Sequence, residues 1–195
     1  MLISGRGSNL QSLIDAIASG RLNATIAVVV SNNADALGLE RARAAGIEAI
    51  VVSHLGWSSR DEYDRALARE LQSRDVGLVC LAGFMRIFAG PMIDAYPDAI
   101  LNIHPALLPS FPGADAQRQA LEHGVKVSGV TVHFVTRDLD AGPIVLQRAV
   151  PVLDDDAVET LAARILEQEH LVYPEAVAIV LDGAWKIAGR RFVRL

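Results

Sequence analysis

The 195-residue sequence has little of several things, and each shortage excludes a class of protein. The single cysteine, Cys80, excludes an intrachain disulfide and fits a reducing compartment such as the cytoplasm. Lysine and arginine total 18 against 23 aspartate and glutamate and form no basic run, so we expect no nucleic acid as a partner. The apolar runs are shorter than the ~18 residues that a membrane span needs, so we expect no membrane partner either.

The sequence has enough apolar residues for one sizeable core. Hydrophobic residues make up 51% and charged residues 21%, as in ordinary folded proteins. This length favours a single domain, which we predict over residues 1–195. In the first half, short apolar runs alternate with helical patterns, which indicates βαβ units and a parallel sheet covered on both faces. With two long strands in the second half, we predict an α/β fold, a Rossmann-like open sheet with an antiparallel C-terminal portion.

Residue patterns place the expected elements along the chain. Three helices are expected to open on a capping pattern, in which Ser8, Ser59 and Asp156 each stand three residues before a Gln or Glu. The last of these helices runs to about residue 181 and is followed by a hairpin over 185–195. The expected strands are 1–4, 25–31, 48–52, 78–82, 100–104, 127–134 and 143–152. Before this last helix, the expected helices are 8–19 and 59–73, which begin at Ser8 and Ser59, together with 36–45 and 113–123.

The strand over residues 100–104 ends in two polar residues. Side chains alternate along a strand, so Asn102 and His104 project from one face, while Leu101 and Ile103 project from the other. Both polar residues stand near the C-terminal end of the strand, where open parallel sheets bind their ligands. Histidine can transfer protons near neutral pH, and an amide N–H can stabilise an oxyanion. Because a histidine at a strand end is often structural, the residues alone make this pair a candidate active site and no more.

A glycine-containing turn, Ser4-Gly5-Arg6-Gly7-Ser8-Asn9, joins the first expected strand to the first expected helix. Glycines permit a tight turn, and the free N–H groups at a helix start form a natural phosphate site. The turn lacks the third glycine of a dinucleotide fingerprint and the Gly-Lys-Ser/Thr of a P-loop. It predicts either a site for a phosphorylated ligand or a merely structural turn.

Two other loops carry candidate residues. Asp140, in the loop over 136–143, could hold the ring of His104, although aspartate is also a common turn residue. The apolar residues after Gly83 could clasp a flat heteroaromatic ligand, and ordinary packing explains them equally well. We interpret His133, inside an expected strand, as structural.

Together and in this order, these segments resemble the phosphoribosylglycinamide formyltransferase family over nearly the whole chain. Asn102, His104 and Asp140 match residues that the wider formyltransferase superfamily shares. The stretch from Gly5 to Asn9 points to the branch that uses a ribonucleotide. The resemblance is strongest over residues 4–9, 31–32 with 38–42, 81–87, 101–109, 131–142 and 168–170.

The resemblance implies that 10-formyltetrahydrofolate, as co-substrate, donates a formyl group to the amine of phosphoribosylglycinamide in de novo purine synthesis. Asn102, His104 and Asp140 would be catalytic. The implied ligands of phosphoribosylglycinamide are Gly7, Ser8 and Asn9, mainly at its phosphate, together with Glu169. The implied folate contacts are Arg60, Met85, Arg86, Ile87, Phe88, Asn102, Thr136, Arg137, Asp138, Leu139 and Asp140.

In the implied reaction, the amine attacks the formyl carbon and creates a tetrahedral oxyanion. Asn102 and protonated His104 would stabilise this charge, and Asp140, with His104 or a water molecule, would transfer the proton. We expect no metal, because these residue types are not those of a Cys-rich zinc site. The expected partners are small-molecule substrates, and the expected state is a monomer or a homodimer.

The sequence departs from the family pattern in three places. The first strand is shorter by several residues. Asp115 stands where the family is expected to have His or Asn, and Leu166 occupies a position that can be polar in relatives. A change at either of the last two positions could alter the affinity for the acceptor.

Three alternatives stay open. Two are folate-dependent formyl enzymes: methionyl-tRNA formyltransferase, which usually adds a C-terminal domain, and formyltetrahydrofolate hydrolase, which usually adds an N-terminal one. We expect neither, because the matching segments run from the first residues to the last part of this chain. The third is a noncatalytic nucleotide-binding module that uses only residues 4–9. Acceptor-dependent turnover distinguishes all three from the formyltransferase.

Overall fold

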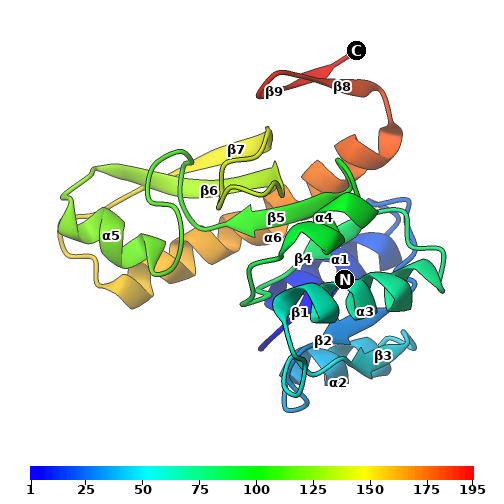
Figure 1. The fold of residues 1–195 in the computed structure, drawn as a ribbon. Coiled ribbons are helices and arrows are strands. Elements are labelled where there is room, and N and C mark those ends of the chain that lie inside the picture. The colour runs from blue at the N-terminus through cyan, green and yellow to red at the C-terminus, as the bar shows by residue number, and fades with distance from the viewer. The chain divides into compact units, whose positions relative to one another are not determined.

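The structure, a computed structural model, describes residues 1–195 as two compact units, Met1–Leu101 and Asn102–Leu195 (Figure 1). We call them the N-unit and the C-unit and describe each by itself. No helix in either unit is both long enough and apolar enough to cross a membrane.

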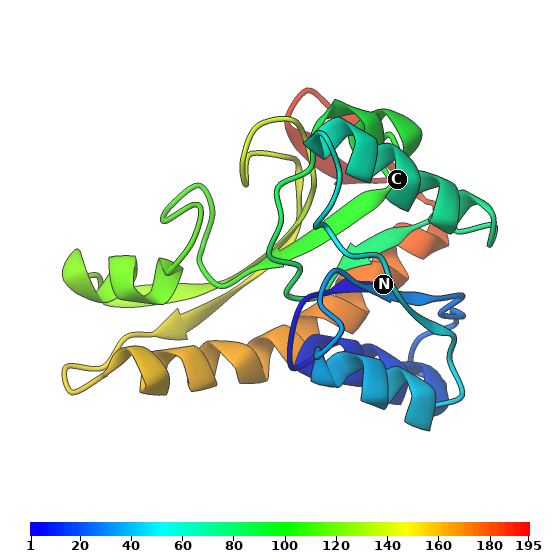
Figure 2. The same ribbon diagram turned by 60° about the horizontal axis from the view of Figure 1, so that its bottom comes forward.

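The N-unit is a parallel sheet with helices on both faces, as predicted. Its strand order is β3-β2-β1-β4. Helices α1 and α2 cover one face of this sheet, and α3 and α4 cover the other (Figures 1 and 2). The strands are β1 (Leu2–Ile3), β2 (Val29–Ser31), β3 (Ala49–Val51) and β4 (Val79–Leu81), and the helices are α1 (Ser8–Ala18), α2 (Leu37–Ala44), α3 (Arg60–Gln72) and α4 (Gly90–Ala95).

Burial explains why these strands read as short unbroken apolar runs. The side chains of β1, β2 and β4 are all buried, because helices cover both faces of the sheet. The open edge strand, β3, has half-buried and exposed residues instead. Cys80, the single cysteine, lies buried in β4.

The C-unit is built on an antiparallel pair of long strands, as predicted for this part of the chain. β6 (Val127–Phe134) pairs with β7 (Ile144–Pro151), and α6 (Val158–Asp182) packs along both. α5 (Ala116–Glu122) also contacts α6. The hairpin of β8 (Trp185–Ala188) and β9 (Arg191–Arg194) joins β7 through one parallel pair, Ile144 with Arg191.

The strand β5 (Ile100–His104) has the predicted bounds, and the division between the units falls inside it. Its apolar residues Leu101 and Ile103 are buried, as the alternation predicts. In strand order, β5 is followed by β6, β7, β9 and β8.

Two of the three predicted helix caps are wrong. Ser8 is the first residue inside α1, and Gly7 caps the helix with φ 69°, so the turn of the chain replaces a side-chain cap. The helix predicted at Asp156 begins at Val158, because Asp156 pairs with Arg164 (2.7 Å) and accepts from the backbone N–H of Leu153. The cap at Ser59 is confirmed, since its hydroxyl accepts from the N–H of Glu62 (3.2 Å).

Two other elements differ from the prediction by more than one residue at an end, and a third was not predicted. α5 begins at Ala116 rather than at 113, because Gly113 and Asp115 have positive φ (80° and 56°), which a right-handed helix does not allow. β2 covers Val29–Ser31 rather than 25–31, because its neighbour β1 offers only Leu2 and Ile3 for pairing. The short helix α4 was not predicted, since six residues that begin with Gly-Pro carry too little periodicity to indicate a helix.

Candidate functional site

A polar cluster lies where β5 ends in the C-unit, and we call its four residues, Asn102, His104, His133 and Asp140, the His104 cluster. Nδ1 of His104 lies 3.5 Å from Oδ2 of Asp140. Nδ2 of Asn102 lies 3.3 Å from Nε2 of His133, which in turn lies 3.7 Å from Oδ1 of Asp140. The structure therefore brings the three predicted catalytic residues together, with His133 as a fourth member.

The contacts of His104 define where its protons lie. Nε2 is 2.8 Å from the carbonyl oxygen of Phe111, and because a carbonyl can only accept, this nitrogen carries a hydrogen. Nδ1 faces the carboxylate of Asp140, so any proton on Nδ1 is shared with an anion. The side chains of His104 and Asp140 are 5% and 9% exposed, so their interaction is only weakly screened by solvent. This arrangement can hold and move a proton.

His133 is buried, and its contacts make it a neutral acceptor. Nδ1 lies 2.9 Å from the carbonyl oxygen of Phe134 and therefore carries the hydrogen, which leaves Nε2 to accept from the amide of Asn102. Burial lowers the pKa of His133, and this effect outweighs the opposing influence of the Phe134 carbonyl and Asp140. His133 thus orients Asn102 without carrying charge.

Sequence reasoning interpreted His133 as structural and missed its contact with Asn102. One signal was available: Thr131 and His133 are polar residues two apart in a strand, so they share a face, and β6 is otherwise largely apolar. A second feature appears only in the structure. The pairing of β6 with β7 shifts register between Val132 and His133, where β7 has one extra residue, Val145, between the partners of these two residues.

Asp140 is held in an uncommon backbone conformation. Its φ is 49°, in the left-handed region that few residues other than glycine adopt. Its Oδ2 accepts from the backbone N–H of Gly113 (2.8 Å), so the carboxylate joins the loop after β5 to the loop before β7. In the same loop, the hydroxyl of Thr136 donates a hydrogen bond to the carbonyl oxygen of Asp138 (3.3 Å). The side chain of Leu139 is 51% exposed. Arg137 and Leu139 thus lie within four residues of Asp140.

The predicted phosphate turn lies in the N-unit, between β1 and α1. Gly7 has φ 69°, and a Cβ atom there would lie 2.6 Å from Cα of Gly38, so only glycine fits. The N–H of Gly38 donates to the carbonyl oxygen of Gly5 (3.0 Å), which holds the turn against α2. Ser8 and Asn9 stand in the first turn of α1, where backbone N–H groups have no partner within the helix. This geometry suits an anionic group.

The segment 85–88 also belongs to the N-unit, and one hydroxyl joins it to the phosphate turn. Ser4 accepts from the backbone N–H of Met85 (2.9 Å) and donates to Oδ1 of Asn32 (2.6 Å). The side chains of Met85 and Ile87 are 79% and 56% exposed, whereas Phe88 is buried against the ring of Phe84. Because Ser4 holds this segment at Met85, the exposed side chains of Met85 and Ile87 are placed to contact a flat ligand.

Helix α3 supports the end of this segment. Asp64 is buried and accepts from the backbone N–H of Ala89 (2.7 Å), and its burial raises the pKa of its carboxyl to about 6. The neighbouring Tyr63 carries the guanidinium of Arg86 over its ring, 5.5 Å from the centroid. Arg60 is the exposed first residue of the same helix. Neither Tyr63 nor Asp64 was predicted, because nothing in the spacing of α3 marks residues that contact a distant loop.

The remaining predicted residues lie in the C-unit. Glu169 is buried on α6. Asp115 caps α5 with φ 56°, a conformation that asparagine also tolerates well. No group of three or more His, Cys, Asp or Glu side chains has an arrangement that could hold a metal ion.

Comparison with known proteins decides the family. A family model described as formyl transferase matches residues 1–177. The chain belongs to the formyltransferases. Within them it belongs with the phosphoribosylglycinamide formyltransferases: that of Escherichia coli K12 is 46% identical over 187 residues, which cover 96% of this chain and 88% of the relative.

Other proteins extend this likeness. The human trifunctional purine biosynthetic protein adenosine-3 is 49% identical over 183 residues, but the chain spans only 18% of its length. Glycinamide ribonucleotide transformylase 1 from Symbiobacterium toebii is 57% identical with a TM-score of 0.98, over 100% of this chain and 92% of that one. A formyltetrahydrofolate deformylase from Pseudomonas syringae is 28% identical with a TM-score of 0.90, over 100% of this chain and 64% of that one.

Proposed function

We propose that this formyltransferase moves the formyl group of 10-formyltetrahydrofolate to the amine of 5′-phosphoribosylglycinamide in de novo purine biosynthesis. The observation that carries the proposal is the placement of His104, Asp140 and Asn102 in one cluster, in a chain 46% identical to a phosphoribosylglycinamide formyltransferase. Transfer occurs by direct attack, with no covalent enzyme intermediate.

The His104 cluster supplies the chemistry of the proposed reaction. The amine nitrogen attacks the formyl carbon, and the carbonyl oxygen gains the negative charge. His104, protonated on Nδ1 beside Asp140, and the amide of Asn102 stabilise that oxyanion, and one such donor is typically worth about 3 kcal/mol. The attacking nitrogen then loses a proton to Asp140, directly or through water. The C–N bond to the folate breaks, and the folate nitrogen leaves with a proton.

The N-unit supplies binding residues. Gly7, Ser8 and Asn9 bind phosphoribosylglycinamide at its phosphate, because the N–H groups at the start of α1 carry partial positive charge. Glu169, from the C-unit, contacts the same substrate. The proposed folate contacts are Asn102, Asp140, Arg60, Met85, Arg86, Ile87, Phe88, Thr136, Arg137, Asp138 and Leu139.

We propose that the reaction needs no metal, because a stabilised oxyanion and a mobile proton are both within the means of the His104 cluster. Small molecules are then the only ligands, with no nucleic acid and no membrane. The chain has a single cysteine and so no intrachain disulfide, which suits a reducing compartment, and we propose the cytoplasm. We propose a monomer or a homodimer, which sedimentation measures, and turnover that persists in excess EDTA.

The decisive experiment measures formation of tetrahydrofolate from 10-formyltetrahydrofolate with and without phosphoribosylglycinamide. We expect turnover only when the acceptor is present. Loss of the formyl group without acceptor would instead support a deformylase, the activity named for the Pseudomonas syringae neighbour. No turnover in the folded protein, with the phosphorylated ligand still bound, would support the binding module.

Two substitutions test the proposed roles in the same assay. We expect His104→Ala and Asp140→Ala each to lower turnover by at least about 10²-fold, because each removes one partner of the His104–Asp140 pair that is proposed to transfer the proton. Urea unfolding monitors whether the variants remain folded. A near-normal rate in either folded variant would exclude that residue from the mechanism.

A further inference from the structure

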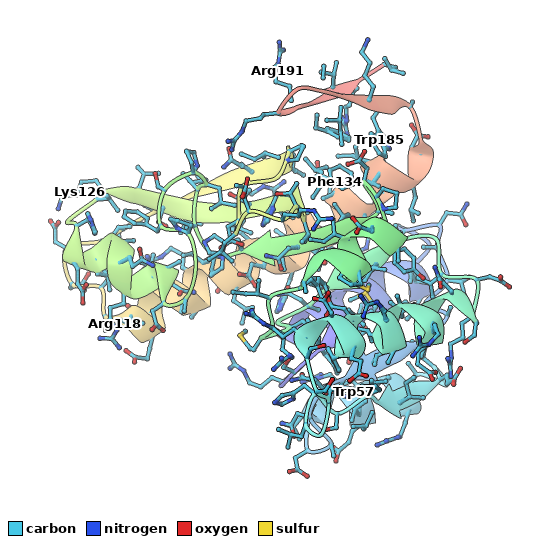
Figure 3. The ribbon with its side chains drawn as sticks, viewed as in Figure 1. Trp57, Arg118, Lys126, Phe134, Trp185 and Arg191 are labelled. Atoms are coloured by element: carbon cyan, nitrogen blue, oxygen red, sulfur yellow. The ribbon has the colours of Figure 1, made fainter.

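The hairpin β8–β9 lies beyond residue 177, where the match to the formyl transferase family ends. Its aromatic residues anchor it to the end of β6. The ring centroid of Phe134 lies 5.3 Å from that of Trp185 and 6.0 Å from that of Phe192, and the last two rings are 5.3 Å apart. Figure 3 labels Phe134 on β6 and Trp185 on the hairpin. The hairpin is thus packed against β6 by three rings.

Phe134 is also the base of the loop that carries Asp140. Its backbone N–H donates to the carbonyl oxygen of Pro143 (2.9 Å), which closes the loop over 135–142. At Gly142, a Cβ atom would lie 1.8 Å from the carbonyl oxygen of Phe134, so the backbone passes as close as glycine allows. The loop is therefore tied at its base to the same residue that anchors the hairpin.

A second tie from the hairpin reaches the residue next to Asp140. Arg190, in the turn between β8 and β9, donates from Nη2 to the carbonyl oxygen of Ala141 (3.0 Å). Asp140 itself has φ 49°, a left-handed conformation that aspartate tolerates better than most residues but that remains strained. Within the C-unit, two hydrogen bonds therefore hold this residue. One joins its carboxylate to Gly113, and the other joins the carbonyl of the next residue, Ala141, to Arg190.

We infer that Arg190 is a positioning residue for the proposed reaction, which holds the Asp140 loop so that the carboxylate stays beside His104. The inference rests on the proposed function for its kinetic consequence and on the Ala141 contact for its geometry. A guanidinium bonded to a backbone carbonyl makes a charge-assisted hydrogen bond, which is stronger than a neutral one. When this bond is lost, the loop samples backbone conformations that move Asp140 away from Nδ1 of His104.

The test compares Arg190→Ala with Arg191→Ala, which removes the same charge from the same hairpin. Arg191 is exposed, and in Figure 3 its side chain extends away from the other labelled residues. We expect Arg190→Ala to lower kcat about 3- to 10-fold with little change in the KM for phosphoribosylglycinamide, since the lost bond is exposed to solvent and Asp140 keeps its bond to Gly113. Arg190→Lys, which keeps a charged donor, should recover part of the rate, and Arg191→Ala should retain it. Equal effects of the two alanine variants would overturn the inference.

A double-mutant cycle separates positioning from a general loss of stability. If Arg190 acts through Asp140, then Arg190→Ala lowers kcat in the wild-type background but changes it less than about 2-fold in the Asp140→Ala background. The same loss in both backgrounds would show that Arg190 acts elsewhere and would overturn the inference.

A measurement without substrates keeps this inference distinct from the proposed function. Amide hydrogen exchange in the peptide that covers residues 135–143 should be faster in Arg190→Ala than in the wild type, and unchanged in Arg191→Ala. If exchange is faster in Arg190→Ala but the wild type has no acceptor-dependent turnover, the proposed function is wrong. The inference that Arg190 holds the Asp140 loop would still stand. Unchanged exchange in Arg190→Ala would show that Arg190 does not hold the Asp140 loop, whatever the activity of the variant.

Discussion

His133 limits what its neighbours in the His104 cluster can do. Its Nδ1 hydrogen is committed to the Phe134 carbonyl, so Nε2 is available only as an acceptor for Asn102. With one N–H of the Asn102 amide used in this way, the orientation of the amide is set, and its second N–H can be offered to a ligand. Burial keeps the pKa of His133 low, so this arrangement persists at neutral pH.

Replacing His133 therefore tests whether the orientation of Asn102 matters. We expect His133→Phe to lower kcat about 5- to 10-fold, because the amide of Asn102 loses its acceptor and a hydrogen bond worth about 1 kcal/mol. Steady-state kinetics measures the effect, and circular dichroism controls for folding. A folded His133→Phe enzyme with the wild-type kcat would contradict the role.

Asp64 makes the stability of the N-unit depend on pH, and this dependence can be measured. Burial raises the pKa of its carboxyl from 3.8 to about 6, so the folded state binds a proton more tightly than the unfolded state. Its contribution to stability is complete below about pH 4 and is lost as the pH rises through about 6. This shift corresponds to about 3 kcal/mol between those limits.

The variant Asp64→Asn has no such titration. We expect its free energy of unfolding, measured relative to the wild type, to improve by up to about 3 kcal/mol between pH 4 and pH 7. Urea unfolding at several pH values measures this difference. Asp35→Asn, at an exposed carboxyl that precedes α2, serves as the control. A constant difference between Asp64→Asn and the wild type across this range would contradict the raised pKa.

Among the elements, β6 has the most direct influence on the loop after His104. The hydroxyl of Thr131 donates to the carbonyl oxygen of Ala106 (2.6 Å) and accepts from the backbone N–H of Leu108 (3.0 Å). Nε2 of Gln147, on β7, lies 2.9 Å from both the Thr131 hydroxyl and the carbonyl oxygen of Leu108. The pair β6–β7 thus holds the segment over 105–109, which contains Pro105 and Pro109.

Thr131→Val keeps the shape of the side chain and removes these bonds. We expect the free energy of unfolding to fall by about 1–3 kcal/mol, because the N–H of Leu108 becomes a buried donor without a partner. Thr131→Ser keeps the hydroxyl and should lose much less. Urea unfolding of both variants measures the difference, and equal losses would assign the effect to the methyl group instead.

The predictions from sequence were correct for features that depend on neighbouring residues and wrong for features that depend on contacts between residues far apart in the sequence. The bounds of β5 and the burial of Leu101 and Ile103 were predicted well, because alternation is a local property of a strand. The cap at Ser8 was wrong because Gly7, packed against Gly38 far along the chain, sets the turn. The roles of His133, Asp64 and Arg190 depend on contacts with residues 25 or more positions away, which no local pattern encodes.

At the scale of the whole molecule, the chain divides into two compact units. The N-unit has the phosphate turn and the segment 85–88, and the C-unit has the His104 cluster. Domain boundaries usually fall in exposed linkers, whereas this division falls between Leu101 and Asn102, inside the strand β5. A boundary within a strand favours the predicted single domain over residues 1–195.

Unfolding tests this prediction, because the two tryptophans of the chain lie in different units. Trp57 precedes α3 and donates from its ring N–H to the carbonyl oxygen of Ser53 (2.8 Å), whereas Trp185 packs on Phe134 (Figure 3). Trp185→Phe leaves a fluorescent reporter only in the N-unit, and Trp57→Phe leaves one only in the C-unit. For a single domain, we expect the fluorescence transition in urea to coincide with the circular dichroism transition in each variant.

Each variant serves as its own reference in this comparison, so a change in stability caused by the substitution does not affect the conclusion. Trp185→Phe keeps an aromatic ring against Phe134 and Phe192, which preserves the anchor of the hairpin. If the fluorescence midpoint in either variant differs from the circular dichroism midpoint, the two units unfold separately, and the chain has two domains. Coincident midpoints mean that the residues proposed to bind the substrates and those proposed to act on them share one cooperative structure.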